Sequence, residues 1–297
     1  MKLTQKTHCK INLLLNVIGL RSDGFHELEM LMMPVPIFDS LEIELTESGI
    51  ELTCNDPNIP SDSNNLVYRA AELFKSKTCI SAGIRIHLEK TIPAEAGLGG
   101  GSGNAAGILL ALNKLHKNPL SQEVLQEIAS YLGSDVTFFL QNRPAIAKGR
   151  GENIKPIGEF SALDGKSLLL IRPRFGISTP WAYKNLAQFP SAKNRPLGQA
   201  EELASELANG NLIKSYEKFY NSLELPVFNK FPLIKLMKEY ALNHGAESAL
   251  MCGSGSTVFI ICSNKNDSES LGESFKSNFG PLAMAKTVTL PGDFNYD

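Results

Sequence analysis

The chain has 297 residues, of which 43% are hydrophobic and 20% are charged, a balance typical of a globular protein with a substantial core. The net charge of −2 and the pI of about 6.3 argue against nucleic acid or an anionic membrane as the main partner. The five cysteines are widely spaced and include no C-x-x-C pair, which predicts free thiols. No leader and no membrane span is visible in the sequence, so we expect a cytoplasmic protein.

Alternating apolar residues predict strands over residues 9–17 and 83–90, and a hairpin over residues 41–54 that turns at Ser48-Gly49. In the second of these strands, Ile84, Ile86 and Leu88 are expected to face inward. The first strand is expected to divide its side chains between two faces, with Cys9, Ile11, Leu13, Leu15 and Val17 on one and Lys10, Asn12, Leu14 and Asn16 on the other.

Helical spacing appears over residues 65–75, 102–116 and 121–132, the last with Ser121 as its expected N-cap. The segment 143–160 is rich in Gly, Pro and charge, which indicates a domain boundary or a long crossover. Beyond it we expect a strand at 167–171, helices near 198–207 and 233–243, and a strand pair flanking the GSGS of residues 253–256. Because no regular βαβ rhythm is visible, the pattern favours an α+β fold.

Residues 97–104 read GLGGGSGN and lie between a predicted strand and a predicted helix. Such a loop is either a flexible connector or a site where an anion approaches the backbone amides at a helix N-terminus. Two common phosphate motifs are excluded, since no Lys-Ser/Thr pair follows the glycines and the spacing is not G-x-G-x-x-G. The strong flanking elements, with Ser102 and Asn104 at useful positions, favour phosphate binding.

Several longer segments carry a resemblance to a known family. PAEAGLGGGSGNAA (93–106) resembles the ATP loop of the galacto-, homoserine, mevalonate and phosphomevalonate (GHMP) kinase superfamily. KINLLLNVIGLRSDGFHELEMLM (10–32), LGSDVTFFL (132–140), GRGE (149–152) and MCGSGSTVF (251–259) resemble, in the same order, the motifs of its CDP-methylerythritol kinases. The resemblance implies a two-domain α+β fold with ATP in the cleft between an N-terminal kinase domain (1–150) and a C-terminal domain (151–297).

The implied reaction is transfer of the γ-phosphoryl group of ATP to the C2 hydroxyl of CDP-methylerythritol, in the non-mevalonate route to isoprenoid precursors. Lys10 and Asp135 match the family's catalytic lysine and aspartate, and an aspartate can take or orient the hydroxyl proton. Asn12, Phe25, His26 and Tyr183 match positions that bind the second substrate, with two aromatic rings for the cytosine and a histidine for its polar edge. The resemblance assigns ATP binding to Pro93, Ala94, Glu95, Ala96, Gly97, Leu98, Gly99, Gly100, Gly101, Ser102, Gly103 and Asn104.

ATP brings Mg²⁺, which usually keeps most of its ligands from phosphates and water. Ser102 is a candidate ligand, and no dedicated metal site is visible in the sequence. Compared with the usual family pattern, Phe25 replaces a tyrosine, Gly103 a serine, Thr137 a proline and Cys9 an alanine. These departures leave Lys10 and Asp135 in place, so we expect activity with altered affinity.

Three alternatives remain. A related kinase acting on mevalonate, homoserine or a sugar would have no obvious use for the Phe25-His26 pair with Tyr183. A catalytically silent nucleotide-binding module would not need both Lys10 and Asp135. A nucleotide-binding dehydrogenase would need a ribose-binding acidic residue after a parallel strand-helix unit, and none is found.

Overall fold

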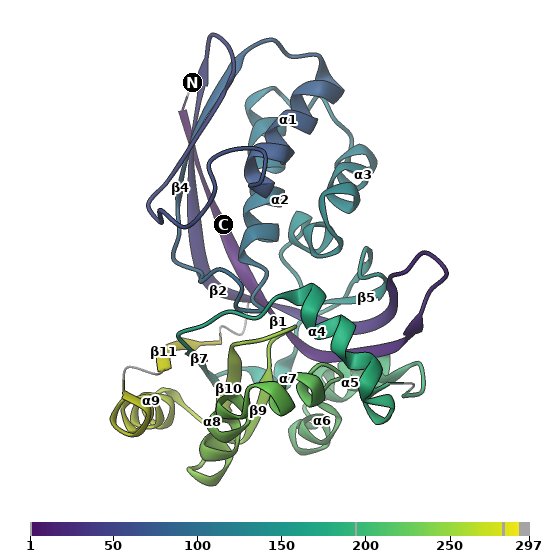
Figure 1. Ribbon diagram of the computed structural model, residues 1–297, viewed down its shortest axis with the longest axis vertical. Coiled ribbons are helices and arrows are strands. Elements are labelled where there is room, and N and C mark those ends of the chain that lie inside the picture. The colour runs from purple at the N-terminus through teal and green to yellow at the C-terminus, as the bar shows by residue number, and fades with distance from the viewer. Residues whose placement is uncertain (1, 194, 281–282, 291–297) are drawn as a thin grey trace.

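A computed structural model describes residues 2–193, 195–280 and 283–290 of the chain (Figure 1). Its strands are β1 (Lys2–Leu20), β2 (His26–Thr46), β3 (Ile50–Cys54), β4 (Gly83–Glu89), β5 (Ala145–Gly149), β6 (Asn153–Pro156), β7 (Ser167–Pro173), β8 (Tyr220–Asn221), β9 (Ser248–Met251), β10 (Val258–Cys262) and β11 (Ala283–Thr289). Its α-helices are α1 (Leu66–Thr78), α2 (Gly100–Leu115), α3 (Gln122–Leu132), α4 (Thr179–Asn185), α5 (Gln199–Ala208), α6 (Leu212–Lys218), α7 (Glu224–Lys230), α8 (Pro232–Asn243) and α9 (Lys265–Phe279). Short 3-10 helices are η1 (Ser134–Leu140), η2 (Ser161–Leu163), η3 (Leu186–Gln188) and η4 (Pro190–Ala192).

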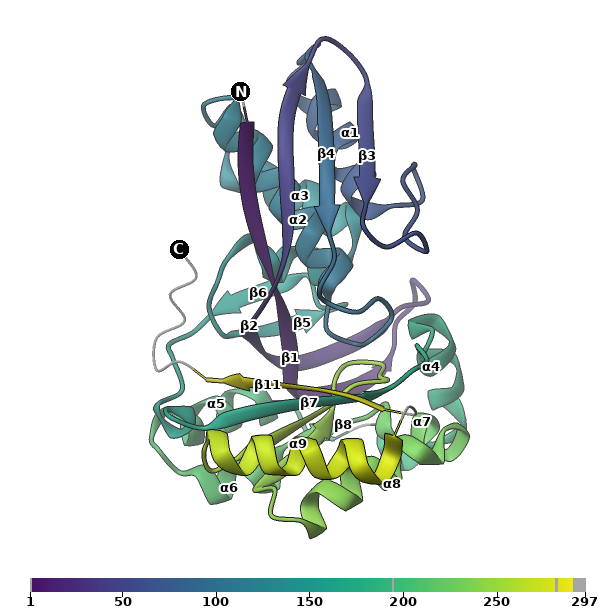
Figure 2. The same ribbon diagram turned by 90° about the vertical axis from the view of Figure 1, so that its left-hand side faces the viewer.

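Two sheets organise the described residues. The larger has seven strands, with β3-β4-β2-β1-β8 in order and β5 and β6 attached to β2, and the smaller has the order β11-β7-β10-β9. The long antiparallel strands β1 and β2 run through both halves of the molecule, and helices α1 to α3 cover one face of their upper part (Figure 2). Helices α8 and α9 lie against the smaller sheet. The helices and strands, which intermix along the chain, confirm the α+β class.

The smaller sheet joins two hydrophobic clusters because side chains alternate along its strands. On β7, Leu168 and Leu170 belong to the cluster that also contains Ile11 and Met33 of the larger sheet. Leu169 and Ile171 point the other way, into a cluster that includes residues of α8 and α9. The two sheets therefore pack on each other through one face, while helices cover the other face of the smaller sheet.

Most predicted elements are confirmed, with local reasons visible in the structure. Asn65 caps α1 by accepting a hydrogen bond from Val67 N, and Ser121 caps α3 by accepting one from Val124 N. The inward residues of β4 are at most 1% exposed, as expected: Ile84, Ile86 and Leu88. The strand pair flanking GSGS is also confirmed, because β9 and β10 are antiparallel neighbours.

Two predictions are wrong. Residues 41–54 do not form a hairpin, because β4 pairs with both β2 and β3 and lies between them. In β1, the register shifts between Asn12 and Leu14, so Leu13 is an extra residue and the faces exchange beyond it. Leu15 consequently belongs to a different cluster from Leu13, although both were expected on one face.

The segment 143–160 contains β5 and β6, an antiparallel pair attached to the larger sheet. The proposed domain boundary at residue 150 falls in the turn between these strands. The division into residues 1–150 and 151–297 stays a prediction, and its last residues, 291–297, lie outside the described part of the chain.

Candidate active site

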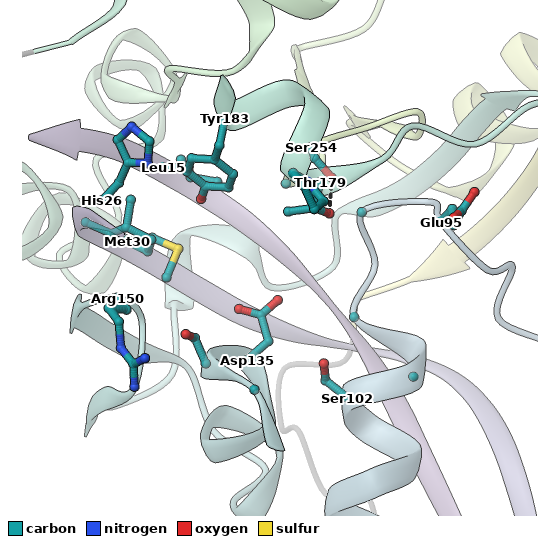
Figure 3. A pocket seen from close by; sticks show the side chains of 18 of the residues that line it. Leu15, His26, Met30, Glu95, Ser102, Asp135, Arg150, Thr179, Tyr183 and Ser254 are labelled. Atoms are coloured by element: carbon teal, nitrogen blue, oxygen red, sulfur yellow. Dashed lines mark hydrogen bonds between the residues drawn. The ribbon is translucent and has the colours of Figure 1, made fainter. Parts of the chain in front are cut away.

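Folding brings Lys10 of β1 and Asp135 of η1 together. Lys10 Nζ lies 3.4 Å from Asp135 Oδ2 and donates a 2.7 Å hydrogen bond to Asn12 Oδ1. The Lys10 side chain is 4% exposed, whereas the Asp135 side chain is 34% exposed and points into a pocket (Figure 3). A nearly buried ammonium group therefore faces a carboxylate that a ligand can reach, a pairing that holds the lysine in one place.

The position of Lys10 is fixed first by its backbone in strand β1. Its amide donates to Leu98 O at 2.9 Å, which ties the strand to the glycine-rich loop. Lys10 and Asn12 precede the register shift in β1 and lie on the pocket side, whereas Asn16 lies beyond the shift and its amide contacts Glu29 instead. The shift thus explains why Lys10 and Asn12, but not Asn16, lie on the pocket side of the strand.

The pocket has a volume of about 900 Å³. It is lined by the middle and end of β1, the β1–β2 turn, the start of β2, the glycine-rich loop, the start of η1, helix α4 and the loop between β9 and β10. Among the predicted site residues it includes Lys10, Phe25, His26, Pro93, Ala94, Glu95, Ala96, Gly97, Leu98, Gly99, Gly100, Gly101, Ser102, Asp135 and Tyr183.

One end of the pocket is formed by the glycine-rich loop and the N-terminus of α2. The N-cap of this 16-residue helix is Gly99, which has a φ of 72° and provides no side-chain cap. The first amides of a helix have no partner within it, and the helix dipole makes this end positive. Gly100, Gly101 and Ser102 line the pocket at this point, so the arrangement suits an anion such as a phosphate.

Packing explains the glycines as much as ligand access does. A Cβ on Gly97, whose φ is 76°, would lie 1.9 Å from the carbonyl oxygen of Cys252 in the loop between β9 and β10. A Cβ on Gly103 would lie 2.9 Å from the carbonyl oxygen of His8, whereas one on Gly101 would meet only Leu66, at 3.9 Å. The loop is therefore a packed element rather than a flexible connector, and Gly101 is the glycine with open space beside it.

Three predicted site residues do not line the pocket. Gly103 faces the interior, and Asn104 is 1% exposed, with its amide donating to Thr7 Oγ1 and Asp39 Oδ2. Asn12 is fully buried beneath Lys10. Direct contact of these residues with ATP or substrate stays a prediction, and their observed partners are other residues of the protein.

The other end of the pocket is aromatic. The rings of His26 and Tyr183 are 5.2 Å apart between centroids and inclined by 32°, and they lie side by side in Figure 3. Phe25 is 52% exposed, and the guanidinium carbon of Arg150 lies 4.8 Å from the centre of its ring. Flat faces and polar ring atoms together suit a planar heterocycle.

Two pKa shifts bear on this end of the pocket. Burial, followed by the charge of Lys193, lowers the pKa of His26, which keeps the imidazole neutral and able to both donate and accept. Burial and the charge of Asp135 raise the pKa of the Tyr183 phenol, so this group remains protonated.

The sequence did not reveal several pocket residues. Thr179 at the start of α4 and Ser254 of GSGS are joined by a 2.8 Å hydrogen bond between their hydroxyls. Arg150 and Lys193 add positive charge to the lining. Arg150 belongs to the GRGE segment and Ser254 to the MCGSGSTVF segment, so both motifs held a signal, whereas Lys193 lies in no recognised motif.

Among residues 2–193, 195–280 and 283–290, no group of three or more His, Cys, Asp or Glu side chains could hold a metal ion. Ser102 and Asp135 both face the pocket, and their oxygen atoms could contact a cation accompanying a nucleotide (Figure 3). No helix in the described part of the chain is long and apolar enough to cross a membrane.

Comparison with known proteins identifies two family regions. Residues 65–143 match the GHMP kinases N terminal domain, and residues 191–281 match the GHMP kinases C terminal family. The first region contains the glycine-rich loop and Asp135, whereas Lys10 and His26 precede it.

Several proteins resemble this chain over most of its length. A Clostridium kluyveri protein named 4-diphosphocytidyl-2-C-methyl-D-erythritol kinase is 35% identical over 283 residues, covering 95% of this chain and 99% of the relative. A Methylacidiphilum infernorum protein of the same name is 40% identical over 264 residues, with 86% and 85% covered. A crystal structure of 4-(cytidine 5'-diphospho)-2C-methyl-D-erythritol kinase superposes with a TM-score of 0.79 at 33% identity, covering 97% of this chain and all of the other. A homoserine kinase from Cytophaga hutchinsonii, at 20% identity and a TM-score of 0.72, shares the fold.

Proposed function

Because this chain belongs to the GHMP kinases, and within them to the 4-diphosphocytidyl-2-C-methyl-D-erythritol kinases, we propose that it transfers the γ-phosphoryl group of ATP to the C2 hydroxyl of that substrate. The product would serve the non-mevalonate route to isoprenoid precursors. The observation that carries this proposal is the Lys10–Asp135 pair, which lies in one pocket with an open helix N-terminus and an aromatic surface. A nucleotide phosphate and a cytidine can thus both reach the reacting groups.

The glycine-rich end of the pocket is the proposed ATP site. The amides at the start of α2 would hold phosphate oxygens, and the helix dipole would favour their negative charge. Mg²⁺ would arrive with the nucleotide and neutralise phosphate charge, and we assign the Ser102 hydroxyl as the residue most suited to contact it.

The reaction needs an aligned hydroxyl and compensation of phosphate charge. The exposed carboxylate of Asp135 can orient the acceptor hydroxyl and take its proton. The ammonium group of Lys10 holds that carboxylate in place and places positive charge beside the transferred group. Asn12 accepts a hydrogen bond from Lys10 and so aims the ammonium group at Asp135.

The aromatic end is the proposed cytidine site. Phe25 and Tyr183 offer faces for the base, and the neutral imidazole of His26 can pair with its polar edge. Mevalonate, homoserine and galactose contain no ring of this kind, so a surface built to hydrogen-bond a base should discriminate strongly against them.

The test is ADP release by the purified protein with each of CDP-methylerythritol, mevalonate, homoserine and galactose. We expect kcat/KM for CDP-methylerythritol to exceed that of the other three by at least about 10³-fold, because a base-binding site would stay unfilled with them. Carbon-phosphorus couplings in the product should place the new phosphate at C2. Comparable rates with the smaller acceptors, or a phosphate at another hydroxyl, would contradict the proposal.

A further inference from the structure

Both ends of the glycine-rich loop meet at a single buried carboxylate, that of Asp39 on β2. Asp39 is 1% exposed, and its Oδ1 accepts hydrogen bonds from Thr91 N at 2.6 Å and Ile92 N at 2.7 Å. These amides belong to the residues that enter the loop. Asp39 Oδ2 accepts a 2.9 Å hydrogen bond from Asn104 Nδ2, in the first turns of α2 where the loop has ended.

Two further side chains complete this cluster. Lys90 Nζ forms an ion pair with Asp39 Oδ2 and donates to Asn104 Oδ1 at 3.1 Å. Asn104 Nδ2 also donates to Thr7 Oγ1 at 2.8 Å, and Thr7 is the cross-strand neighbour of Asp39. Every polar atom of the Asn104 side chain is thereby used inside the protein, which explains why this residue does not face the pocket.

We propose that Asp39 is a positioning residue for the nucleotide. Its single carboxylate group binds both ends of the glycine-rich loop and so fixes the distance between them. This inference rests on the proposed function, in which the loop binds ATP. Glycine-rich backbone is costly to order, so a loop fixed before binding loses less entropy when the phosphates arrive. The carboxylate also accepts from the backbone amides of Thr91 and the buried Ile92, which would otherwise lack these partners.

The ion pair between Asp39 and Lys90 does not by itself explain why Asp39 also contacts both ends of the loop. One carboxylate oxygen is committed to the entry of the loop and the other to Asn104 at its exit. The Lys90 ammonium group also lies beside the N-terminus of α2, because a Cβ on Gly100 would come within 3.2 Å of it. The cluster therefore contacts the loop at its entry, at its exit and at the start of the helix.

The test uses Asp39→Asn, which keeps the shape of the side chain. The Oδ1 atom can still accept from Thr91 and Ile92, but an NH₂ donor replaces Oδ2, which is the acceptor for Asn104 and Lys90. We expect the Kd for a non-hydrolysable ATP analogue, measured by calorimetry, to rise about tenfold, the effect of losing a charged hydrogen bond. KM for ATP should rise in parallel, whereas KM for CDP-methylerythritol should stay within about twofold. In the double variant Asp39→Asn/Asn104→Asp, carboxylate and carboxamide exchange places and most of the affinity should return.

Glu29→Gln is the matched control, because Glu29 is a fully buried carboxylate on the same strand that accepts instead from Gly198 N at 2.7 Å, before α5. It should lower the Tm and leave analogue binding unchanged. Equal weakening of both substrates by Asp39→Asn, or a lowered Tm with unchanged analogue Kd, would overturn the inference. Should Asp39→Asn fail to fold, Asn104→Ala removes the exit contact, together with the hydrogen bonds of Asn104 to Lys90 and Thr7, and leaves the entry contacts of Asp39 in place. An unchanged Kd in that variant would also overturn the inference.

The proposed function is tested separately by these measurements. Analogue binding needs no acceptor substrate. If the wild-type protein binds the analogue but does not phosphorylate CDP-methylerythritol, the proposed function fails. Weakened analogue binding in Asp39→Asn would still support the positioning role.

Discussion

Replacement of Lys10 by methionine tests the chemistry most directly, because it removes the charge while keeping a long side chain of similar volume. The ammonium group lies 3.4 Å from Asp135 Oδ2. At an effective dielectric constant of about 20, two unit charges at that separation interact by about 5 kcal/mol. The Asp135 side chain is 34% exposed, so solvent reduces this value, and about 3–4 kcal/mol is a reasonable net loss.

If this stabilisation is lost from the transition state and not from the bound ground state, kcat falls by roughly 10²–10³, at 1.36 kcal/mol for each factor of ten. Coupled ADP release at saturating substrates measures kcat, and titration of each substrate gives the two KM values. Because Lys10 acts in part by holding Asp135, the variant Lys10→Met/Asp135→Asn should be little slower than Asp135→Asn alone. Asp135→Asn by itself should reduce turnover to a low residual rate and leave binding of an ATP analogue largely intact.

Lys148→Met is the matched control, since Lys148 is 45% exposed and pairs with Glu201 away from the pocket. It should leave kcat unchanged. A Lys10→Met enzyme whose kcat stays within threefold of wild type, with only a raised KM, would refute the reasoning and make Lys10 a binding residue. Strictly additive effects of Lys10→Met and Asp135→Asn would show that the two groups act independently.

Three further predictions concern binding and stability. His26→Ala should raise KM for the cytidine substrate at least about tenfold and spare KM for ATP, and equal losses in steady-state kinetics would contradict its placement at the base. Gly97→Ala should lower the Tm and weaken ATP-analogue binding, because the added Cβ would overlap the carbonyl of Cys252. An unchanged melting curve and Kd would mean that the glycine-rich loop and the loop between β9 and β10 are not packed as described. Burial lowers the pKa of His8, so the unfolded chain binds a proton there before the native one does, and stability should fall as the pH drops below about 6.5, the ordinary histidine value. The drop in Tm between pH 7 and pH 5 should be smaller in His8→Gln, and an identical drop would exclude this group.

Family resemblance, rather than periodicity, selected the reactive residues. Lys10 and Asp135 look ordinary in isolation, as a lysine on a strand and an aspartate after a turn. Their juxtaposition at 3.4 Å could not be derived from spacing, because a strand and a distant 3-10 helix meet only through the tertiary fold. For Lys193, which lies in no motif, neither pattern nor resemblance gave a signal.

Local pattern was sufficient for elements whose burial is decided by their own sequence. The alternation of Ile84, Ile86 and Leu88 defined β4, and Asn65 and Ser121 marked the starts of two helices, because strand and helix periodicities place apolar side chains on one side. Pairing between strands was different. Only the tertiary structure decided that β4 lies between β2 and β3, because register depends on partners far away in the chain.

In the glycine-rich loop, the local sequence and the tertiary contacts determine different properties. The sequence by itself determined that a strand, a run of glycines and a helix follow each other, which is the local requirement for binding an anion at a helix N-terminus. Only the tertiary structure decided what each residue of the run does. Gly97 packs against Cys252, Asn104 turns inward to Asp39, and Gly101 stays open to the pocket, because these roles depend on neighbours that come from distant strands and loops.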